Sequence, residues 1–71
     1  MFEDVKIGDE LWSVQDGWGA VISINSSYYP LGVKFEQRSE TFTIEGKTHK
    51  RNLYPTLFWD EVKFQRKEKD V

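Results

Sequence analysis

Apolar and polar residues alternate in short runs along this chain, and turn-forming residues separate one run from the next. Successive side chains of a strand point to opposite faces, so alternation with a period of two predicts half-buried strands. The runs predict strands at residues 10–14, 20–25, 31–36 and 41–45. Short strands at this spacing, with turn signals between them, are typical of a small closed β-barrel. We therefore predict an all-β fold.

Glycine marks the predicted turns. Gly17 and Gly19 flank Trp18, and glycine adopts positive φ or a sharp bend at no steric cost. The sequence therefore predicts a tight turn over residues 15–17, with the Trp18 ring held at the corner. A second turn is expected at residues 46–47, where the fourth strand ends.

The alternation also predicts which side chains fill the barrel. The residues expected to face inward are Trp12, Leu31, Val33, Phe35, Phe42 and Ile44, and those expected to face outward include Lys34, Glu36, Thr41 and Thr43. The second strand differs because Val21, Ile22 and Ile24 place apolar groups on both faces, which a curled strand does near a β-bulge. Leu53 is expected to anchor the chain where it returns to the core.

The ends of the chain are less regular than its middle. Residues 1–7 form a short lead-in that either extends the first strand or lies across one open end of the barrel. We assign residues 1–65 to a single domain. Residues 66–71 are charged, hold too little apolar surface to become ordered, and are expected to fray.

The segment before this tail has two interpretations. Residues 56–59 are dense in apolar side chains and residues 61–64 alternate, which favours a fifth strand. A helix from Thr56 onward competes with it, since Phe58 and Val62 are four residues apart.

The composition limits what the chain does. Its 71 residues include no cysteine, so it has neither a disulfide framework nor a cysteine-based zinc site. The net charge of −2 disfavours a general nucleic-acid or anionic-membrane binder. No apolar run approaches the ~20 residues that cross a bilayer, and the first residues lack the pattern of a signal peptide. A cytoplasmic location is expected.

No residue pattern predicts catalysis. His49 is the only histidine and has no carboxylate beside it in the sequence, whereas a nucleophilic triad needs a base held by an orienting acid. Five carboxylates are candidates for a hard-metal site or an acid–base pair, namely Asp9, Glu10, Asp16, Asp60 and Glu61. Such residues more often solvate turns and blunt strand edges. We expect a non-enzymatic protein with no catalytic residue, no metal ion and no cofactor.

The chain holds more large aromatic side chains than so small a barrel buries: three Trp, three Tyr and five Phe. Rigid rings on loops at the rim of a small barrel bind partners well because they lose little entropy on contact. The predicted partner-binding residues are Trp18, Tyr28, Tyr29, Tyr54 and Trp59. For Phe58 and Trp59, an equal alternative is a second small core that plugs the open side of the barrel.

One basic cluster occupies residues 47–51. Lys47, Lys50 and Arg51 are the candidate anion-binding residues, because a phosphate-contacting loop needs cationic side chains. The competing interpretation is a solvated hairpin end, which the negative net charge favours.

These residues carry a resemblance to a known class of domain. The pattern resembles SH3-like barrels of the KOW/Tudor type, in particular the Tudor-like domain at the C-terminus of UvrD/PcrA-type helicases and the polymerase-interacting domain of CarD-type regulators. Those domains share a G-D-x-V … G-x-G-x-V … V-x-F scheme, which matches here at Gly8-Asp9, Gly17-Trp18-Gly19-Ala20-Val21 and Val33-Lys34-Phe35. The resemblance implies a five-stranded SH3-like barrel. Residues 54–59 depart from the helicase-domain pattern, and the whole chain resembles short uncharacterised phage and prophage proteins.

The expected function is that of a non-enzymatic protein-interaction module. The phage resemblance implies an accessory protein that docks on a bacterial host protein and acts in the host cytoplasm. A homodimer formed through two aromatic rims is a close variant. The alternatives are a nucleic-acid-binding module, with phosphate on the basic cluster and bases on Trp18 or Tyr28, and a protein that binds a small anionic nucleotide.

Overall fold

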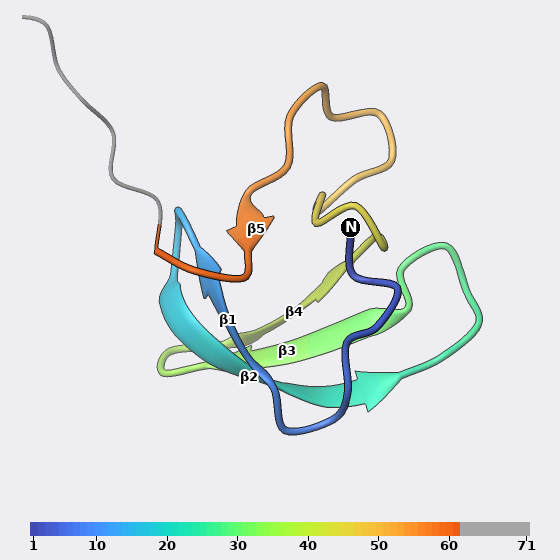
Figure 1. The fold of residues 1–71 in the computed structure, drawn as a ribbon. Coiled ribbons are helices and arrows are strands. Elements are labelled where there is room, and N and C mark those ends of the chain that lie inside the picture. Colours follow the sequence, from blue (N-terminus) through green and yellow to red (C-terminus); the bar gives the residue numbers. More distant parts are fainter. Residues whose placement is uncertain (62–71) are drawn as a thin grey trace, which may run out of the picture.

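Five strands form one antiparallel sheet in the computed structural model, which describes residues 1–61 (Figure 1). The strands are β1 (Glu10–Ser13), β2 (Gly17–Ile24), β3 (Leu31–Phe35), β4 (Ser39–Phe42) and β5 (Leu57–Phe58). Their order in the sheet is β4-β3-β2-β1-β5, and the sheet curls around one face. The prediction of an all-β fold is confirmed, and the curled sheet is compatible with an SH3-like barrel.

The fifth strand settles the interpretation of residues 56–59. β5 pairs with β1 through Trp12–Phe58 and Ser13–Leu57, so the alternative of a helix from Thr56 is wrong. Glu61 belongs to no strand. The rest of the strand predicted at 61–64, the end of the predicted domain at residue 65 and the predicted tail at 66–71 lie outside the described residues.

The β1–β2 turn confirms part of the glycine argument and corrects the rest. Gly17 has φ +80°, as the predicted turn requires, but β2 begins at that residue rather than at residue 20. Gly19 makes no bend. It is paired with Leu11 and Phe35, and a Cβ on it would lie 2.5 Å from the Phe35 ring. Gly19 therefore lets that ring pack against the backbone of β2.

A β-bulge in β2 explains its apolar residues on both faces. Val21 pairs with Val33 and Ser23 pairs with Gly32, so Ile22 is the extra residue and is exposed. The predicted bulge is confirmed.

The core lies on the concave face of the sheet. Its buried apolar residues are Phe2, Val5, Leu11, Val21, Leu31, Val33, Phe35, Phe42 and Leu57, with Ile44 packed against them. The inward positions predicted for β3 and for Phe42 are confirmed. Trp12 was expected in the core but lies on the convex face, because its neighbours Leu11 and Ser13 point inward. The lead-in supplies a large ring instead, that of Phe2.

Two further predictions about the core, those for Thr43 and Leu53, are wrong. β4 covers 39–42 rather than 41–45, because residues 43–47 fold into a tight turn in which Gly46 has φ +88°. Thr43 is buried rather than exposed, since its hydroxyl accepts hydrogen bonds from the backbone N–H of Lys47 (3.1 Å) and Glu45 (3.3 Å). Leu53 is 82% exposed and anchors nothing; Leu57 enters the core instead.

The 43–46 turn and the lead-in close the side that the sheet leaves open between β4 and β5. The Phe2 N–H donates to the Ile44 carbonyl (2.9 Å), and the Gly46 carbonyl accepts from the N–H groups of Thr56 (2.9 Å) and Leu57 (3.1 Å). The lead-in therefore lies across the open side, which is one of the two alternatives the sequence allowed.

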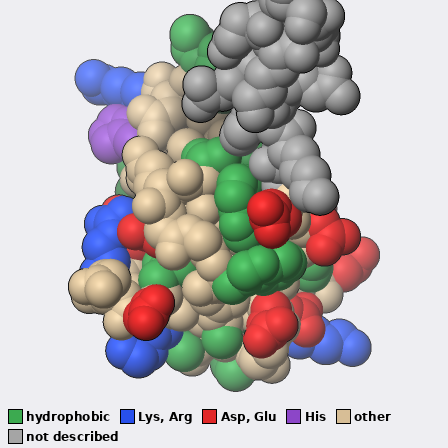
Figure 2. All heavy atoms as spheres, turned by 90° about the vertical axis from the view of Figure 1, so that its left-hand side faces the viewer, with side chains coloured by type: hydrophobic (Ala, Val, Ile, Leu, Met, Phe, Trp, Pro, Cys, Tyr) green, Lys and Arg blue, Asp and Glu red, His purple; other side chains and the backbone are tan. Residues whose placement is uncertain are grey.

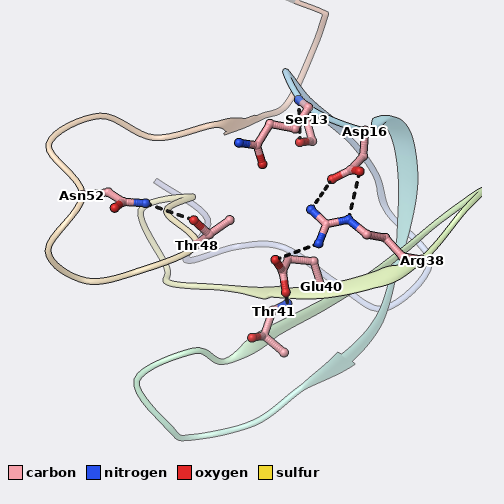
Figure 3. A network of polar contacts seen from close by, with 8 residues as sticks. Ser13, Asp16, Arg38, Glu40, Thr41, Thr48 and Asn52 are labelled. Atoms are coloured by element: carbon pink, nitrogen blue, oxygen red, sulfur yellow. Dashed lines mark hydrogen bonds and ion pairs between the residues drawn. The ribbon is translucent and has the colours of Figure 1, made fainter.

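A polar network joins the tips of two hairpins. Arg38, on the β3–β4 turn, donates to both carboxylate oxygens of Asp16 on the β1–β2 turn (2.9 and 3.0 Å) and to Glu40 (3.2 Å) (Figure 3). The Asp16 carboxylate, which accepts these hydrogen bonds, raises the pKa of Arg38 above its ordinary value.

Arg38→Ala is expected to lower the melting temperature slightly, by less in high salt than in low salt, because the pairs lie at the surface and are screened. Thermal unfolding at two ionic strengths measures this. Arg51→Ala is the control, since its exposed side chain makes no ion pair with residues 1–61. A large loss that is independent of salt would show that Arg38 packs rather than pairs.

Candidate functional site

Three aromatic side chains lie side by side on the convex face of the sheet. Trp12 of β1 is directly opposite Trp18 of β2 on one side and Phe58 of β5 on the other. Directly opposite residues share a face and lie close together, and the Trp12 and Phe58 ring centroids are 6.5 Å apart. We call these three residues the aromatic row. Trp18 is 46% exposed, and the other two rings are half-buried.

The sequence predicted Trp18 as a partner-binding residue but did not predict that Trp12 and Phe58 lie beside it. Trp12 was expected inside because its strand offers apolar side chains on both faces, Leu11 on one and Trp12 with Val14 on the other. Alternation alone shows which residues share a face of a strand, but it does not show which face is buried. A search for aromatic residues at matching positions of adjacent strands would have found the row.

Carboxylates flank the aromatic row. Glu10 lies two residues before Trp12 on the same face of β1, Asp60 and Glu61 follow β5, and all three are exposed. Figure 2 shows the side of the molecule that holds the β1–β2 turn and β5, where hydrophobic side chains gather with several Asp and Glu side chains beside them. Three described carboxylates therefore stand close to the row in the sequence, and one exposed lysine, Lys34, lies on the same face of the sheet opposite Ala20.

A second group of aromatic and basic side chains comes from two loops. The Tyr29 hydroxyl accepts a hydrogen bond from the Lys50 backbone N–H (3.2 Å), and the Tyr29 and His49 ring centroids are 6.4 Å apart. The Lys50 ammonium lies 4.5 Å from the centroid of the Tyr28 ring, which is a cation–π contact. We call Tyr28, Tyr29, His49 and Lys50 the loop cluster. The structure thus brings together two predicted partner-binding tyrosines and one predicted anion-binding lysine.

Of the other predicted site residues, Tyr54, Trp59 and Lys47 belong to neither group, and Arg51 directly follows Lys50 in the sequence. Tyr54 is 77% exposed on the long loop before β5. The Trp59 indole packs on Phe2, with ring centroids 5.2 Å apart, and its Nε1–H donates to the Met1 carbonyl (3.3 Å). Lys47 pairs with Glu45 (3.6 Å), while Arg51 is exposed. The five predicted partner-binding residues therefore do not form one rim.

Residues 57–59 comprise β5 and the residue that follows it, and each of the three side chains packs in a different place. Leu57 joins the main core, Phe58 lies in the aromatic row, and Trp59 covers Phe2 while staying 42% exposed. These residues therefore pack on two faces of one sheet and do not form a second core of their own.

Within residues 1–61, both groups of side chains lie on the open surface and not in an enclosed site. These residues line no pocket, and no three or more His, Asp or Glu among them lie close enough to hold a metal ion. The His49 Nδ1 accepts a hydrogen bond from the Arg51 backbone N–H (3.1 Å), so this nitrogen stabilises the backbone of its own loop. What the described chain offers a partner is flat aromatic area and charge.

Fold and site together define a small all-β protein, a curled five-stranded sheet that is compatible with an SH3-like barrel and carries aromatic side chains on its convex face. No protein-family model, curated protein or solved structure matches the chain. Residues 1–61 contain no helix that is long and apolar enough to cross a membrane.

Proposed function

We propose that this chain is a non-enzymatic protein-interaction module that docks through the aromatic row. The observation that supports this most directly is the register Trp18–Trp12–Phe58, which places three large rings in a line on a sheet rather than on loops. Rings fixed on strands lose little conformational entropy when a partner covers them. Tryptophan is also enriched among the residues that dominate binding energy at interfaces.

The surroundings of the row favour a partner with positive charge. Glu10 lies on the same face of β1 as Trp12, and the exposed Asp60 and Glu61 follow Phe58 closely in the sequence. Opposite charge across an interface speeds association and rejects acidic competitors. A second copy of this chain is disfavoured as the partner, because the carboxylates beside the two aromatic rows would then face each other.

The proposal extends to the kind of module and its setting. We assign the curled sheet to the Tudor/KOW type and regard the protein as a phage or prophage accessory that docks on a bacterial host protein in the cytoplasm. The Gly8-Asp9, Gly17-x-Gly19-x-Val21 and Val33-x-Phe35 scheme in the sequence supports the Tudor/KOW type. The resemblance of the whole chain to short phage and prophage proteins supports the setting.

A quantitative pull-down from bacterial lysate tests the docking function. We expect at least one protein to be retained by the wild type and by Tyr54→Ala, but not by Trp18→Ala. Removal of a tryptophan that acts as a binding hot spot weakens binding by at least about 2 kcal/mol, or about 30-fold. Tyr54→Ala is the matched control because it also removes an exposed ring, at a position away from the row.

Thermal unfolding of Trp18→Ala must first show that the variant is folded. Retention of the same proteins by Trp18→Ala and by the wild type would contradict the proposal, and so would the absence of any reproducibly enriched protein. Sedimentation over a range of concentrations separates docking on another protein from self-association. A dimer that Trp18→Ala dissociates would identify a second copy as the partner.

A further inference from the structure

Positive and negative charge are separated within residues 1–61. Residues 46–56 contain Lys47, Lys50 and Arg51 and no acidic residue, whereas the rest of residues 1–61 hold three basic and ten acidic residues. The loop at residues 25–30, which contacts the basic segment, carries no charge. The basic segment is therefore a local positive region on a negatively charged protein, and the net charge of −2 conceals it.

The loop cluster lies at the opposite end of β2 from Trp18. Trp18 follows the β1–β2 turn, and Tyr28 follows the other end of the strand (Figure 1). β2 has eight residues, which at a rise of about 3.3 Å per residue separates its ends by roughly 23 Å. A ligand on the loop cluster is therefore independent of the aromatic row and of the proposed docking function.

Both loops are held in place before any ligand binds. The Asn25 side chain accepts hydrogen bonds from the Ser27 N–H (2.9 Å) and hydroxyl, and the Ser27 hydroxyl accepts from the Tyr29 N–H (3.2 Å). In the other loop, the Asn52 amide donates to the Thr48 hydroxyl (3.0 Å). The Tyr29–Lys50 hydrogen bond then joins the two loops.

This arrangement presents a flat ring against the Lys50 ammonium, and a second cationic residue, Arg51, follows Lys50 in the sequence. Tyr28 is 73% exposed although Lys50 lies against it, so most of the ring remains open. Arg51, the next residue, is exposed and forms no ion pair within the described chain, while Lys47 is already paired with Glu45. One aromatic surface and two available positive charges are what a nucleotide unit needs, since its base stacks and its phosphate pairs with cations.

We propose that the loop cluster, with Arg51, binds single-stranded nucleic acid. A base stacks on the open part of the Tyr28 ring, and the neighbouring phosphates contact Lys50 and Arg51. A single strand suits the site better than a free nucleotide, because no pocket encloses the ligand and successive phosphates add contacts along an open surface.

Fluorescence anisotropy with labelled oligothymidine and oligouridine, titrated over a range of salt concentrations, tests this proposal. With two phosphate contacts, the slope of log affinity against log salt is expected near −1.4, at about −0.7 per contact. Lys50→Ala and Arg51→Ala are each expected to reduce the slope by about 0.7. Tyr28→Ala is expected to weaken binding about 5- to 150-fold with little change in slope, as loss of one stacked base does.

Three controls keep the result specific. Tyr28→Phe keeps the ring and is expected to bind as the wild type does. Lys34→Ala removes an exposed lysine on β3, away from the cluster, and Trp18→Ala removes the exposed ring of the aromatic row; neither is expected to matter. Loss of oligonucleotide binding in Trp18→Ala would place the site on the row and overturn the assignment to the loops.

Thymidine and uridine monophosphate complete the test. The proposal predicts that they bind more weakly than the oligonucleotides. It fails if neither oligonucleotide binds at low salt, or if Lys50→Ala and Arg51→Ala leave the slope unchanged. Binding of the monophosphates as tightly as the oligonucleotides would identify a free-nucleotide site and would also overturn the proposal. The outcomes with the Tyr28, Lys50 and Arg51 variants and with the monophosphates do not bear on the lysate experiment with Trp18→Ala.

Discussion

Phe2→Ala is expected to lower the free energy of unfolding by about 3–5 kcal/mol, the cost of truncating a buried phenylalanine to alanine. The Phe2 ring is fully buried, packs against Trp59 and lies next to Gly46, so its loss leaves a cavity where the lead-in, the 43–46 turn and β5 meet. A chain of 71 residues has a total stability of roughly 4–11 kcal/mol, at 0.05–0.15 kcal/mol per residue. Urea unfolding measures the loss.

Leu53→Ala is the comparison for Phe2→Ala. Leu53 is 82% exposed, so its removal is expected to change stability by no more than about 0.5 kcal/mol. The pair of variants tests the assignment of the core directly. If Leu53→Ala cost more than Phe2→Ala, the lead-in would not lie across the open side of the sheet.

Gly46→Ala is expected to cost about 2–5 kcal/mol for two separable reasons. The residue has φ +88°, where an L side chain costs roughly 1–2 kcal/mol. A Cβ there would also lie 2.6 Å from the Leu57 carbonyl oxygen and 2.9 Å from the Phe2 ring. Relief of this overlap costs a further ~1–3 kcal/mol and disturbs the hydrogen bonds that the Gly46 carbonyl accepts from Thr56 and Leu57.

Gly8→Ala separates the two causes. Gly8 has φ +99°, but no atom lies within 4 Å of the position its Cβ would take. Gly8→Ala is therefore expected to cost only the conformational term, about 1–2 kcal/mol. Equal losses of stability in the two variants would mean that the contact of Gly46 with Phe2 and Leu57 contributes nothing.

The two surfaces of the protein differ in how they are held. The aromatic row stands on three paired strands, whereas the loop cluster depends on hydrogen bonds within and between two loops. Tyr29→Phe removes the hydroxyl that accepts from Lys50 and keeps the ring, so it tests the link between the loops without changing the charge of the cluster.

The sequence by itself determined the features that depend on short-range chemistry. Alternation predicted β3 and its inward residues, because a strand that carries apolar side chains on a single face can bury them in just one orientation. The turn at Gly17, the turn at Gly46 and the bulge at Ile22 followed from glycine's access to positive φ and from a break in the alternation.

Only the tertiary structure decided which of two apolar faces is buried and which distant segments meet. Leu11 and Trp12 lie on opposite faces of β1, and both are apolar. Which of the two is buried depended on the packing of the core, to which Phe2 and Leu57 contribute from the two ends of the described chain. The aromatic row required the pairing of β1 with β5, and the loop cluster required contact between residues 21 apart. Sequence patterns report neighbours within one turn or strand. These contacts join separate elements, and their geometry was set by how the whole core packs.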